Sequence, residues 1–336
     1  MREWKGKSIE PGCDWCCPGA NALRIRLLIS IVSPIFAGVF LIQGFFEARI
    51  LPGGYSLRIS IIGAGRVGRA IGRAAYLAGN EIGDVVCTSL SSAIAATRFI
   101  GAGTARESRD AALEPANLIL ISTQDDRIGM AVELVKRAAG LANHPGWLES
   151  KRRYPVTVLH TSGALSSEVL RSLKPWGFVT GSCHPLQTFE SARRSLATIK
   201  RSYFCIEGEP AAVRAARRLV RGIGGRFFEI PTAQKELYHA GAVLASGGLV
   251  ALLSISLEIL GRCRLSEEAA KRILFPLIEG TMANIQAVGP ARAMTGPVRR
   301  GDEGTIRRNT RALSGVDQDW ARIYKLLAKR SFTLLS

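Results

Sequence analysis

The residues best suited to chemistry gather in three short polar segments and one later histidine. The segments are residues 123–126 (Thr-Gln-Asp-Asp), 160–163 (His-Thr-Ser-Gly) and 184–188 (His-Pro-Leu-Gln-Thr), and the later residue is His239. An imidazole can give or take a proton near neutral pH, and hydroxyl and amide groups can orient a polar substrate. These residue types favour proton transfer at a polar group. Such side chains can act together only if the helices and strands of the fold bring them to one place.

A glycine-rich turn follows the first apolar segment of the body of the chain. Residues 57–62 have the pattern of a buried strand, and residues 66–77 have the pattern of a helix. Between them Gly63, Gly65 and Gly68 have the G-x-G-x-x-G spacing, in which the glycines permit a tight turn, a close approach to a pyrophosphate and close helix packing. The segment predicts a dinucleotide site at the helix N-terminus. The alternative is a turn that binds no ligand.

The residues after the second expected strand, 82–87, indicate the choice of cofactor. An acidic side chain about 20 residues after the motif hydrogen-bonds the ribose of NAD. This chain has Thr-Ser-Leu-Ser-Ser at 88–92, which favours NADP and leaves NAD as the alternative. Arg98 either adds a cation there or is a solvated helix residue. The expected cofactor contacts are Gly63, Gly65, Arg66, Val67, Gly68, Thr88, Ser89, Thr123 and Asp126.

Strands and helices alternate through the body of the chain. Further strands are expected at residues 118–122, 156–160, 178–182 and 202–207, and helices near 127–139, 166–173 and 211–223. This alternation predicts the α/β class, with a doubly wound Rossmann sheet. Such sheets bind ligands at the carboxyl ends of their strands. Since the three polar segments follow strands, a cleft is expected there.

After Pro231 the pattern changes to long apolar helices without strands, expected at residues 234–260, 266–288 and 305 to about 335. A loop at 295–302 in this region carries Arg299, Arg300 and Asp302. We therefore expect a helical C-terminal domain that completes the substrate site. The expected domains are an extension at 1–56, a Rossmann dinucleotide-binding domain at 57–231 and an all-α substrate and dimerisation domain at 232–336.

Five motifs together resemble those of a known family. They are IIGAGRVG at 61–68, HTSG at 160–163, HPLQTF at 184–189, YHA at 238–240 and TGPVRRGD at 295–302. From about Leu57 to its end, the chain resembles the Rossmann-like proteins with a C-terminal helical domain of unknown function. These are distant relatives of ketopantoate reductase, pyrroline-carboxylate reductase and 6-phosphogluconate dehydrogenase. The resemblance implies an oxidoreductase that uses a nicotinamide cofactor.

The first helix of the C-terminal domain departs from the ketopantoate reductase pattern, which resembles Lys-x-x-x-Asn-x-x-x-Asn. Laid on this chain, the pattern puts His239 at the lysine, and Val243 and Gly247 at the two asparagines. The family likeness also implies Ser-Asn where Gly247 follows Ser246, and a histidine in place of Asn309. The substrate contacts therefore differ from those of these relatives.

The expected reaction is hydride transfer to a small carbonyl compound that carries a carboxylate, such as a 2-oxo acid, with ketopantoate as the example the family likeness suggests. His239 would protonate the new alkoxide, unless it is a hydrogen-bonded histidine at a domain interface. Arg299 or Arg300 would clamp the carboxylate while Asp302 orients the loop, unless that loop is a surface turn. Ser162, His184 and Ser246 are expected as polar lining, with Tyr238 as support. The alternative function is a cofactor-binding sensor or partner protein without catalysis.

Charge and cysteine content restrict the other classes. Lys and Arg number 45 against 27 Asp and Glu, but no long basic run with interleaved aromatics occurs, which argues against nucleic acid and favours phosphate-bearing ligands. Four single cysteines indicate a reducing, cytoplasmic compartment: Cys87, Cys183, Cys205 and Cys263. Three more, Cys13, Cys16 and Cys17, lack a fourth ligand at zinc-site spacing, so no metal is expected. A homodimer through the C-terminal helices is expected.

Residues 27–46 form an uncharged segment preceded by Arg24 and Arg26. Its length is sufficient for a membrane-spanning helix, but Pro34 and Gly38 weaken that interpretation. Three alternatives stay open: a membrane anchor, a poorly structured segment from an over-extended reading frame, and an added packing helix. No catalytic residue is expected in this extension.

Overall fold

The computed structural model describes residues 56–109, 113–140, 155–190 and 192–335. The chain divides into two compact units, Met1–Glu47 and Ala48–Ser336. The uncharged segment 27–46 and the three N-terminal cysteines lie outside the described residues, so the fold below belongs to the second unit.

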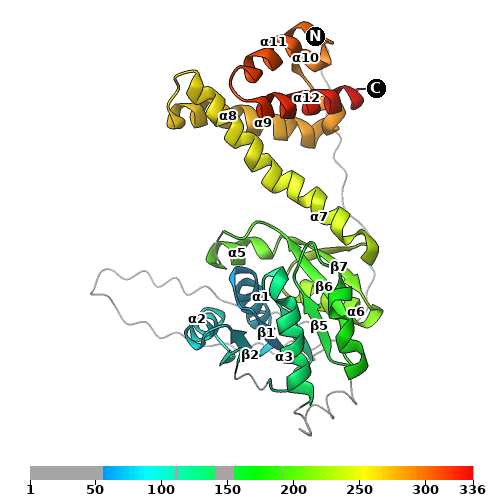
Figure 1. Cartoon of the computed structure of the whole chain (residues 1–336). Coiled ribbons are helices and arrows are strands. Elements are labelled where there is room, and N and C mark those ends of the chain that lie inside the picture. The colour runs from blue at the N-terminus through cyan, green and yellow to red at the C-terminus, as the bar shows by residue number, and fades with distance from the viewer. Residues whose placement is uncertain (1–55, 110–112, 141–154, 191, 336) are drawn as a thin grey trace, which may run out of the picture. The chain divides into compact units, whose positions relative to one another are not determined.

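The described residues form an eight-stranded sheet in the order β3-β2-β1-β4-β5-β6-β7-β8 (Figure 1). The strands are β1 Arg58–Ile62, β2 Glu81–Cys87, β3 Thr104–Glu107, β4 Leu118–Ile121, β5 Thr157–His160, β6 Val179–Leu186, β7 Tyr203–Gly208 and β8 Arg226–Glu229. Among these strands, β6 and β7 pair antiparallel and the other neighbours pair parallel. The first six positions have the 3-2-1-4-5-6 order of a doubly wound nucleotide-binding sheet, which confirms the predicted fold class.

Helical segments cover both faces of the sheet. They are α1 Arg66–Leu77, α2 Leu90–Ile100, η1 Asp125–Arg127, α3 Ile128–Gly140, η2 Ser167–Trp176, α5 Ala192–Ile199 and α6 Pro210–Gly222. One apolar core joins the sheet to α1, α2 and α6, and the other joins it to α3 and η2. In β1, Ile61 belongs to the first core and Ile62 to the second, because successive strand residues point to opposite faces. The sheet is thus buried on both sides.

The observed strands differ from the sequence prediction at both edges of the sheet and in β6. The edge strands β3 and β8 are short and carry charged residues, so they lack the apolar pattern that reveals a buried strand. Strand β6 continues to Leu186, although the pattern predicted an end at Ser182. His184 and Pro185 therefore lie within a strand that pairs with β7, and not in a loop after it. His184 is therefore part of the sheet itself.

The C-terminal region is helical, as predicted. Its segments are η3 Thr232–Gln234, α7 Lys235–Val243, the π-helical turn Leu244–Gly248, α8 Leu249–Arg262, α9 Glu267–Ala293, α10 Gly296–Arg299, α11 Glu303–Ser314 and α12 Gln318–Thr333. The stretch expected as one final helix is two helices, α11 and α12. Asp317 ends the connection between them, because its side chain accepts hydrogen bonds from Asp319 N at 2.7 Å and Trp320 N at 3.0 Å and caps α12.

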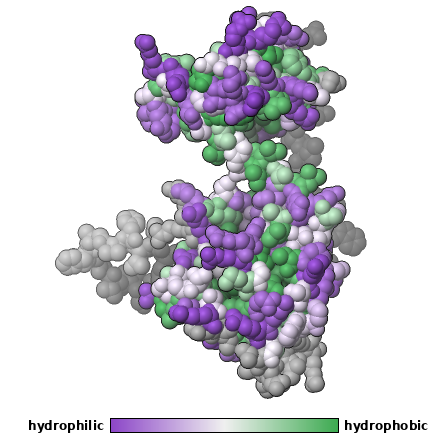
Figure 2. Space-filling model, in the orientation of Figure 1, coloured by the Kyte–Doolittle hydropathy of each residue, from purple (hydrophilic) through white to green (hydrophobic). Residues whose placement is uncertain are grey.

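Many apolar side chains of these C-terminal helices lie at the surface (Figure 2). The exposed fractions of Leu244, Val250 and Leu277 are 74%, 67% and 66%. Within the described residues, one helical stretch, Thr232–Arg262, has the length and composition of a membrane span.

Candidate active site

The glycine-rich turn after β1 has the geometry of a dinucleotide-binding loop. Gly63 has φ +86°, and a Cβ there would lie 2.6 Å from Thr123 Cγ2 and 2.7 Å from Thr123 N. A Cβ on Gly68 would lie 2.9 Å from Gly63 O, so the start of α1 packs directly on the turn. In contrast, no described heavy atom lies within 4 Å of a Cβ built on Gly65. The turn is closed on its inner side and open in front of α1.

The N-terminus of α1 is available to an anion. Gly65 occupies the N-cap position, and among the described residues no side chain caps this helix. The first N–H groups of a helix lack intrahelical partners and carry the positive end of the helix dipole. A phosphate group in the open space at Gly65 would satisfy them.

The end of β2 presents hydroxyl groups next to a cation that the sequence interpretation missed. Ser89 caps α2 by accepting a hydrogen bond from Ser92 N at 3.3 Å. Arg69 donates to Ala64 O at 2.9 Å and to Ser92 O at 3.4 Å, so its guanidinium joins the glycine turn to the serine-rich turn. Its position directly after the third motif glycine is the signal that could have revealed it. Thr88 is exposed at the same turn.

The structure does not bring Arg98 to this turn. Arg98 lies in the last turn of α2, whereas Ser89 caps the first. At a rise of 1.5 Å per residue, Ser89 and Arg98 are about 13 Å apart along the helix axis. Arg69 is therefore the better placed cation.

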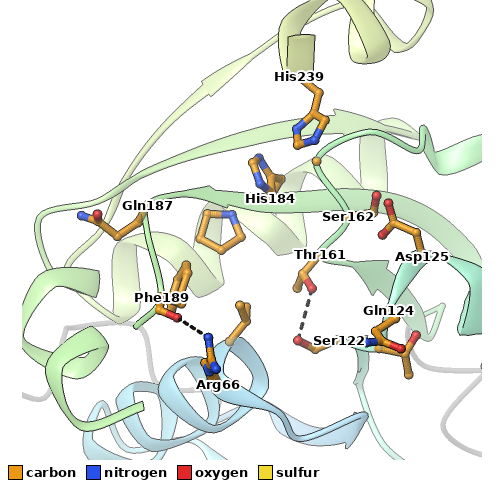
Figure 3. A pocket seen from close by; sticks show the side chains of 14 residues that line it. Arg66, Ser122, Gln124, Asp125, Thr161, Ser162, His184, Gln187, Phe189 and His239 are labelled. Carbon is orange, nitrogen blue, oxygen red and sulfur yellow. Dashed lines mark hydrogen bonds between the residues drawn. The ribbon is translucent and has the colours of Figure 1, made fainter. Parts of the chain in front are cut away.

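A pocket of about 650 Å³ opens at the carboxyl ends of β1, β4, β5 and β6 (Figure 3). Its lining residues are Arg66, Val67, Ser122, Thr123, Gln124, Asp125, Thr161, Ser162, Gly163, His184, Pro185, Gln187, Phe189 and His239. The three polar segments thus meet at one place, as the sheet predicted. Asp125 lines the pocket, whereas the expected cofactor contact Asp126 is not among the lining residues.

The segment after β5 is held by hydrogen bonds at the rim of the pocket. Thr161 Oγ1 donates to Ser122 Oγ at 3.2 Å. Ser162 Oγ accepts from Leu165 N at 3.0 Å, and Ser162 N donates to His160 Nδ1 at 3.2 Å. Ser162 accepts in this bond, so its hydroxyl proton is available to a ligand.

Two histidine rings face Gly163 from different elements (Figure 3). His184 comes from β6 and His239 from α7, and their ring centroids are 5.8 Å apart. A Cβ on Gly163 would overlap His239 Nδ1 and would lie 2.8 Å from His184 Nε2. Only a glycine leaves room for both rings. His239 Nδ1 is buried and has no hydrogen-bond partner among the described residues.

Burial and charge set the protonation of the pocket. Burial, Lys235 and His239 lower the pKa of His184 to about 3, and His184 Nδ1 lies 2.8 Å from Tyr238 Oη. Burial also lowers the pKa of His160 to about 3. Both imidazoles are therefore neutral at pH 7. Burial raises the pKa of Tyr238, so its phenol keeps its proton.

Lys235 lies buried beneath these groups and was not singled out from the sequence. Burial lowers the pKa of its ammonium group, while the thiol of Cys205 and the carboxylate of Glu207 act in the opposite direction. Glu207 also accepts from Ser167 N at 2.8 Å and from Ser167 Oγ at 2.7 Å, which holds the start of η2. A lysine at the first position of a helix is normally solvated, so no sequence pattern marked it.

The expected carboxylate clamp lies elsewhere in the described chain. Asp302 caps α11, because Oδ1 accepts from Thr305 N at 2.9 Å and Oδ2 from Thr305 Oγ1 at 2.6 Å. Arg299 ends α10, and neither it nor Arg300 lines the pocket. Ser246 is exposed in the π-helical turn and does not line the pocket. Among the described residues, no cluster of histidine, cysteine and carboxylate groups could hold a metal ion.

Fold and site together define a dinucleotide-binding domain of the Rossmann type followed by a helical domain. Residues 53–185 match the family described as a Rossmann-like domain, and residues 202–331 match the family described as Domain of unknown function (DUF2520). The chain thus combines these two domains, as its motifs predicted. No curated protein matches the chain in sequence.

Solved structures share this fold over most of the chain. A Thermotoga maritima protein has a TM-score of 0.63 at 22% identity, over 82% of this chain and 98% of that one. A candidate NADP oxidoreductase from Bacteroides fragilis has 0.63 at 23% identity, over 83% and 98%. A Plasmodium falciparum pyrroline carboxylate reductase with NADP bound has 0.51 at 12% identity, over 83% and 98%. At these identities the likeness establishes the fold.

Proposed function

We propose that the chain is an NADP-dependent reductase that transfers a hydride to the C=O or C=N carbon of a small carboxylate-bearing compound. The observation that carries this proposal is the convergence of Ser162, His184 and His239 on a pocket that continues from the dinucleotide turn. The similar structures named as an NADP oxidoreductase and as a pyrroline carboxylate reductase with NADP bound support the same chemistry.

The residues present fit a dinucleotide. The open space at Gly65 and the uncapped start of α1 suit the pyrophosphate, and Arg66 and Val67 lead from there to the pocket. Thr88, Ser89 and Arg69 at the end of β2 suit a 2′-phosphate, since these residues offer hydroxyl and guanidinium donors and no carboxylate. NADP is therefore the proposed cofactor, with NAD as the alternative.

NADPH, when bound, supplies the hydride, and the side chains of the chain handle the substrate. In this proposal the hydride forms the new C–H bond, and the π electron pair of the C=O or C=N group moves to its oxygen or nitrogen. His239 gives that atom a proton and later regains one from water. Ser162 donates its hydroxyl proton to orient the substrate. Half-buried imidazoles and the buried hydroxyl of Ser162 need no large rearrangement for these steps.

The substrate carboxylate has two candidate partners. Arg299 or Arg300 stays a prediction that requires the C-terminal loop to reach the pocket. Arg66 already lines the pocket, where its Nη1 donates to Phe189 O at 3.3 Å. A guanidinium can bind a carboxylate through two hydrogen bonds, so each of these arginines has the chemistry that the clamp requires.

A screen of NADPH oxidation by the full-length chain tests the function. The panel contains 2-oxo acids, among them ketopantoate, and cyclic imines with and without a carboxylate. We expect turnover of at least one carboxylate-bearing substrate, with NADPH preferred to NADH. If calorimetry shows NADPH binding but no compound is reduced by wild type, the alternative function as a cofactor-binding sensor or partner protein replaces this one.

We also propose that a second copy of the chain covers the apolar C-terminal helices. Helix α8 has no buried residue in the described chain, although its side chains are mostly apolar. Glu258 and Ser254 hydrogen-bond within α8, and a carboxylate is costly in lipid. Homodimer interfaces, in contrast, resemble a hydrophobic core cut in half. A second copy therefore fits this surface better than a bilayer.

The mass in solution tests the dimer. We expect wild type to sediment as a dimer and a Leu244→Glu, Val250→Glu double variant to sediment as a monomer. Met130→Glu is the matched control, since Met130 is 72% exposed on α3, away from these helices in the sequence. A monomeric wild type, or binding of the wild type to lipid vesicles that the double variant loses, would contradict the proposal.

A further inference from the structure

A polar cluster lies on one face of the antiparallel pair β6 and β7, beside α7. Ser182 pairs with Glu207, and His184 pairs with Cys205. Directly paired residues point to the same face of a sheet, and so do residues two apart in one strand. These four side chains therefore share a face. Cys183 and Ile206 point to the opposite face, into the apolar core.

Helix α7 adds Lys235 and Tyr238 to this cluster. Lys235 Nζ donates to Ser182 Oγ at 2.5 Å and lies 5.8 Å from the centroid of the Tyr238 ring. The Tyr238 ring packs edge-on against Phe228 with a centroid distance of 5.7 Å. Tyr238 thus lies between β8 and the buried ammonium group, and its hydroxyl lies next to both His184 Nδ1 and the thiol of Cys205.

The hydrogen bond between Tyr238 and His184 joins a protonated phenol to a neutral imidazole. Burial raises the pKa of the phenol, and the buried Lys235 ammonium disfavours a second positive charge on the imidazole. A phenol can donate to an unprotonated ring nitrogen or accept from a protonated one. In the arrangement in which Tyr238 Oη donates to His184 Nδ1, the proton of the neutral imidazole lies on Nε2.

The Nε2 side of His184 faces the pocket. A Cβ on Gly163 would approach this nitrogen to 2.8 Å, and Figure 3 shows the ring of His184 next to that of His239 among the residues that line the pocket. His184 lines the pocket, and the glycine at 163 leaves its Nε2 without a covering side chain. An N–H group held there by a second residue is preorganised for an atom with a lone pair.

We propose that Tyr238 holds His184 as a neutral imidazole whose Nε2–H donates to the reacting atom of the substrate, so that the site selects a carbonyl oxygen or an unprotonated imine nitrogen. This inference rests on the proposed reductase function. His184 lends a hydrogen bond and keeps its proton, while His239 supplies the proton of the new O–H or N–H bond. An iminium ion, whose nitrogen already carries a proton, has no lone pair for His184.

The charged and titratable groups around His184 come from several elements. Lys235, Tyr238 and His239 face it from α7, and Cys205 faces it from β7. His160 on β5 interacts electrostatically with it. After burial, Lys235 contributes most to the lowered pKa of His184, which makes Lys235 a positioning residue for the neutral state of His184.

Nitrogen NMR of the full-length chain tests the protonation state without any substrate. We expect ¹⁵N shifts of His184 to show a neutral ring with its proton on Nε2 from about pH 5 to 8, the range in which a free histidine titrates. Tyr238→Phe should shift the ring toward a mixture of tautomers, while Tyr203→Phe, at the start of β7, should leave it unchanged. A proton on Nδ1, or an imidazolium in this range, would overturn the proposal even if the reductase function holds.

Kinetic measurements distinguish a hydrogen-bonding role of His184 from a purely structural one. His184→Gln keeps an N–H donor, whereas His184→Leu keeps only the bulk. Loss of one preorganised donor costs about 10²- to 10³-fold in kcat, so the Leu variant should fall by that factor and the Gln variant by clearly less. NADPH affinity, measured by calorimetry, should be unchanged in both. Equal losses in the two variants would refute a donor role.

The pH dependence with a cyclic imine tests the selectivity. We expect kcat/KM to rise as the pH passes above the pKa of the imine, because the unprotonated form is the one that accepts from Nε2. A rate that follows the iminium form would overturn the selectivity. Turnover of no imine together with turnover of 2-oxo acids leaves the carbonyl oxygen as the acceptor and agrees with the proposal, provided that the His184→Leu loss is seen there.

Discussion

The ammonium group of Lys235 donates a hydrogen bond to the hydroxyl of Ser182 over 2.5 Å and thereby joins the first residue of α7 to the middle of β6. Lys235 is 1% exposed, so this contact places a buried positive charge beneath the histidines of the pocket. The charge adds to burial in holding His160 and His184 neutral. Protonation of these residues is thus coupled to the folding of the chain.

We predict a loss of stability in acid that depends on these two histidines. Their pKa falls from 6.5 to about 3 on folding, so below pH 6.5 the unfolded chain binds protons that the folded chain does not. The stabilisation is complete above pH 6.5 and is lost as the pH falls toward 3, by about 1.4 kcal/mol per pH unit for each histidine. Urea unfolding from pH 7 to pH 4 measures it. His184→Gln should remove one histidine's share, and an unchanged slope in that variant would contradict the assignment.

Gly65→Leu should abolish NADPH binding and leave the fold intact. A Cβ on Gly65 would meet no described atom within 4 Å, so a side chain can start there and occupy the proposed pyrophosphate position. Gly63→Ala is the matched contrast, because its Cβ would strain φ and overlap Thr123, and it should lower the melting temperature. Calorimetry and thermal unfolding measure the two effects. Normal NADPH affinity in Gly65→Leu would show that the pyrophosphate binds at another place.

Arg69→Ala should weaken NADPH more than NADH. Its guanidinium lies beside the serine-rich turn, and a hydrogen bond to a charged group contributes about 1.5–3 kcal/mol, which corresponds to about 10- to 150-fold in affinity for NADPH. Arg98→Ala is the control, since Arg98 lies at the far end of α2, and should bind both cofactors normally. Titration of the two variants with both cofactors decides between the arginines. A selective NADPH defect in Arg98→Ala would reverse their roles.

His239→Ala should lower kcat far more than it lowers NADPH affinity. In the proposed mechanism His239 acts only as negative charge develops on the substrate, and loss of a general acid costs about 10²- to 10⁴-fold in rate. Steady-state kinetics with the substrate found in the screen, together with calorimetry, separate the two quantities. Near-full turnover across the pH range would show that the proton comes from another residue.

Variants of Arg66, Arg299 and Arg300 should locate the substrate carboxylate. A carboxylate clamp acts in the ground state as well as in the transition state, so its loss raises KM first. We expect Arg299→Ala or Arg300→Ala to raise KM if the C-terminal loop reaches the site, and Arg66→Ala to do so if one described chain forms the clamp alone. A matched substrate without the carboxylate should be insensitive to the correct variant. If all three variants keep the wild-type KM, the clamp is none of these residues.

The central fold and the dinucleotide turn could be predicted from the sequence because both depend on local patterns. Apolar runs bounded by turns marked β1 and β4, and the glycine spacing marked the turn at Gly63, where a positive φ and the nearby Thr123 exclude a side chain. The edge strands β3 and β8 were not predicted, because half-exposed, charged strands carry no such pattern. The split between α11 and α12 depends on a single capping aspartate within a helical composition.

The sequence by itself determined a doubly wound sheet, its phosphate-binding turn and the three polar segments at its edge, since periodicity and glycine spacing are properties of neighbouring residues. Only the tertiary structure decided which side chains meet. Residues as distant as Gly163, His184 and His239 come together because β5, β6 and α7 are adjacent in space. The lowered pKa values of Lys235 and His184 depend on desolvation, which arises only when α7 packs on the sheet and excludes water.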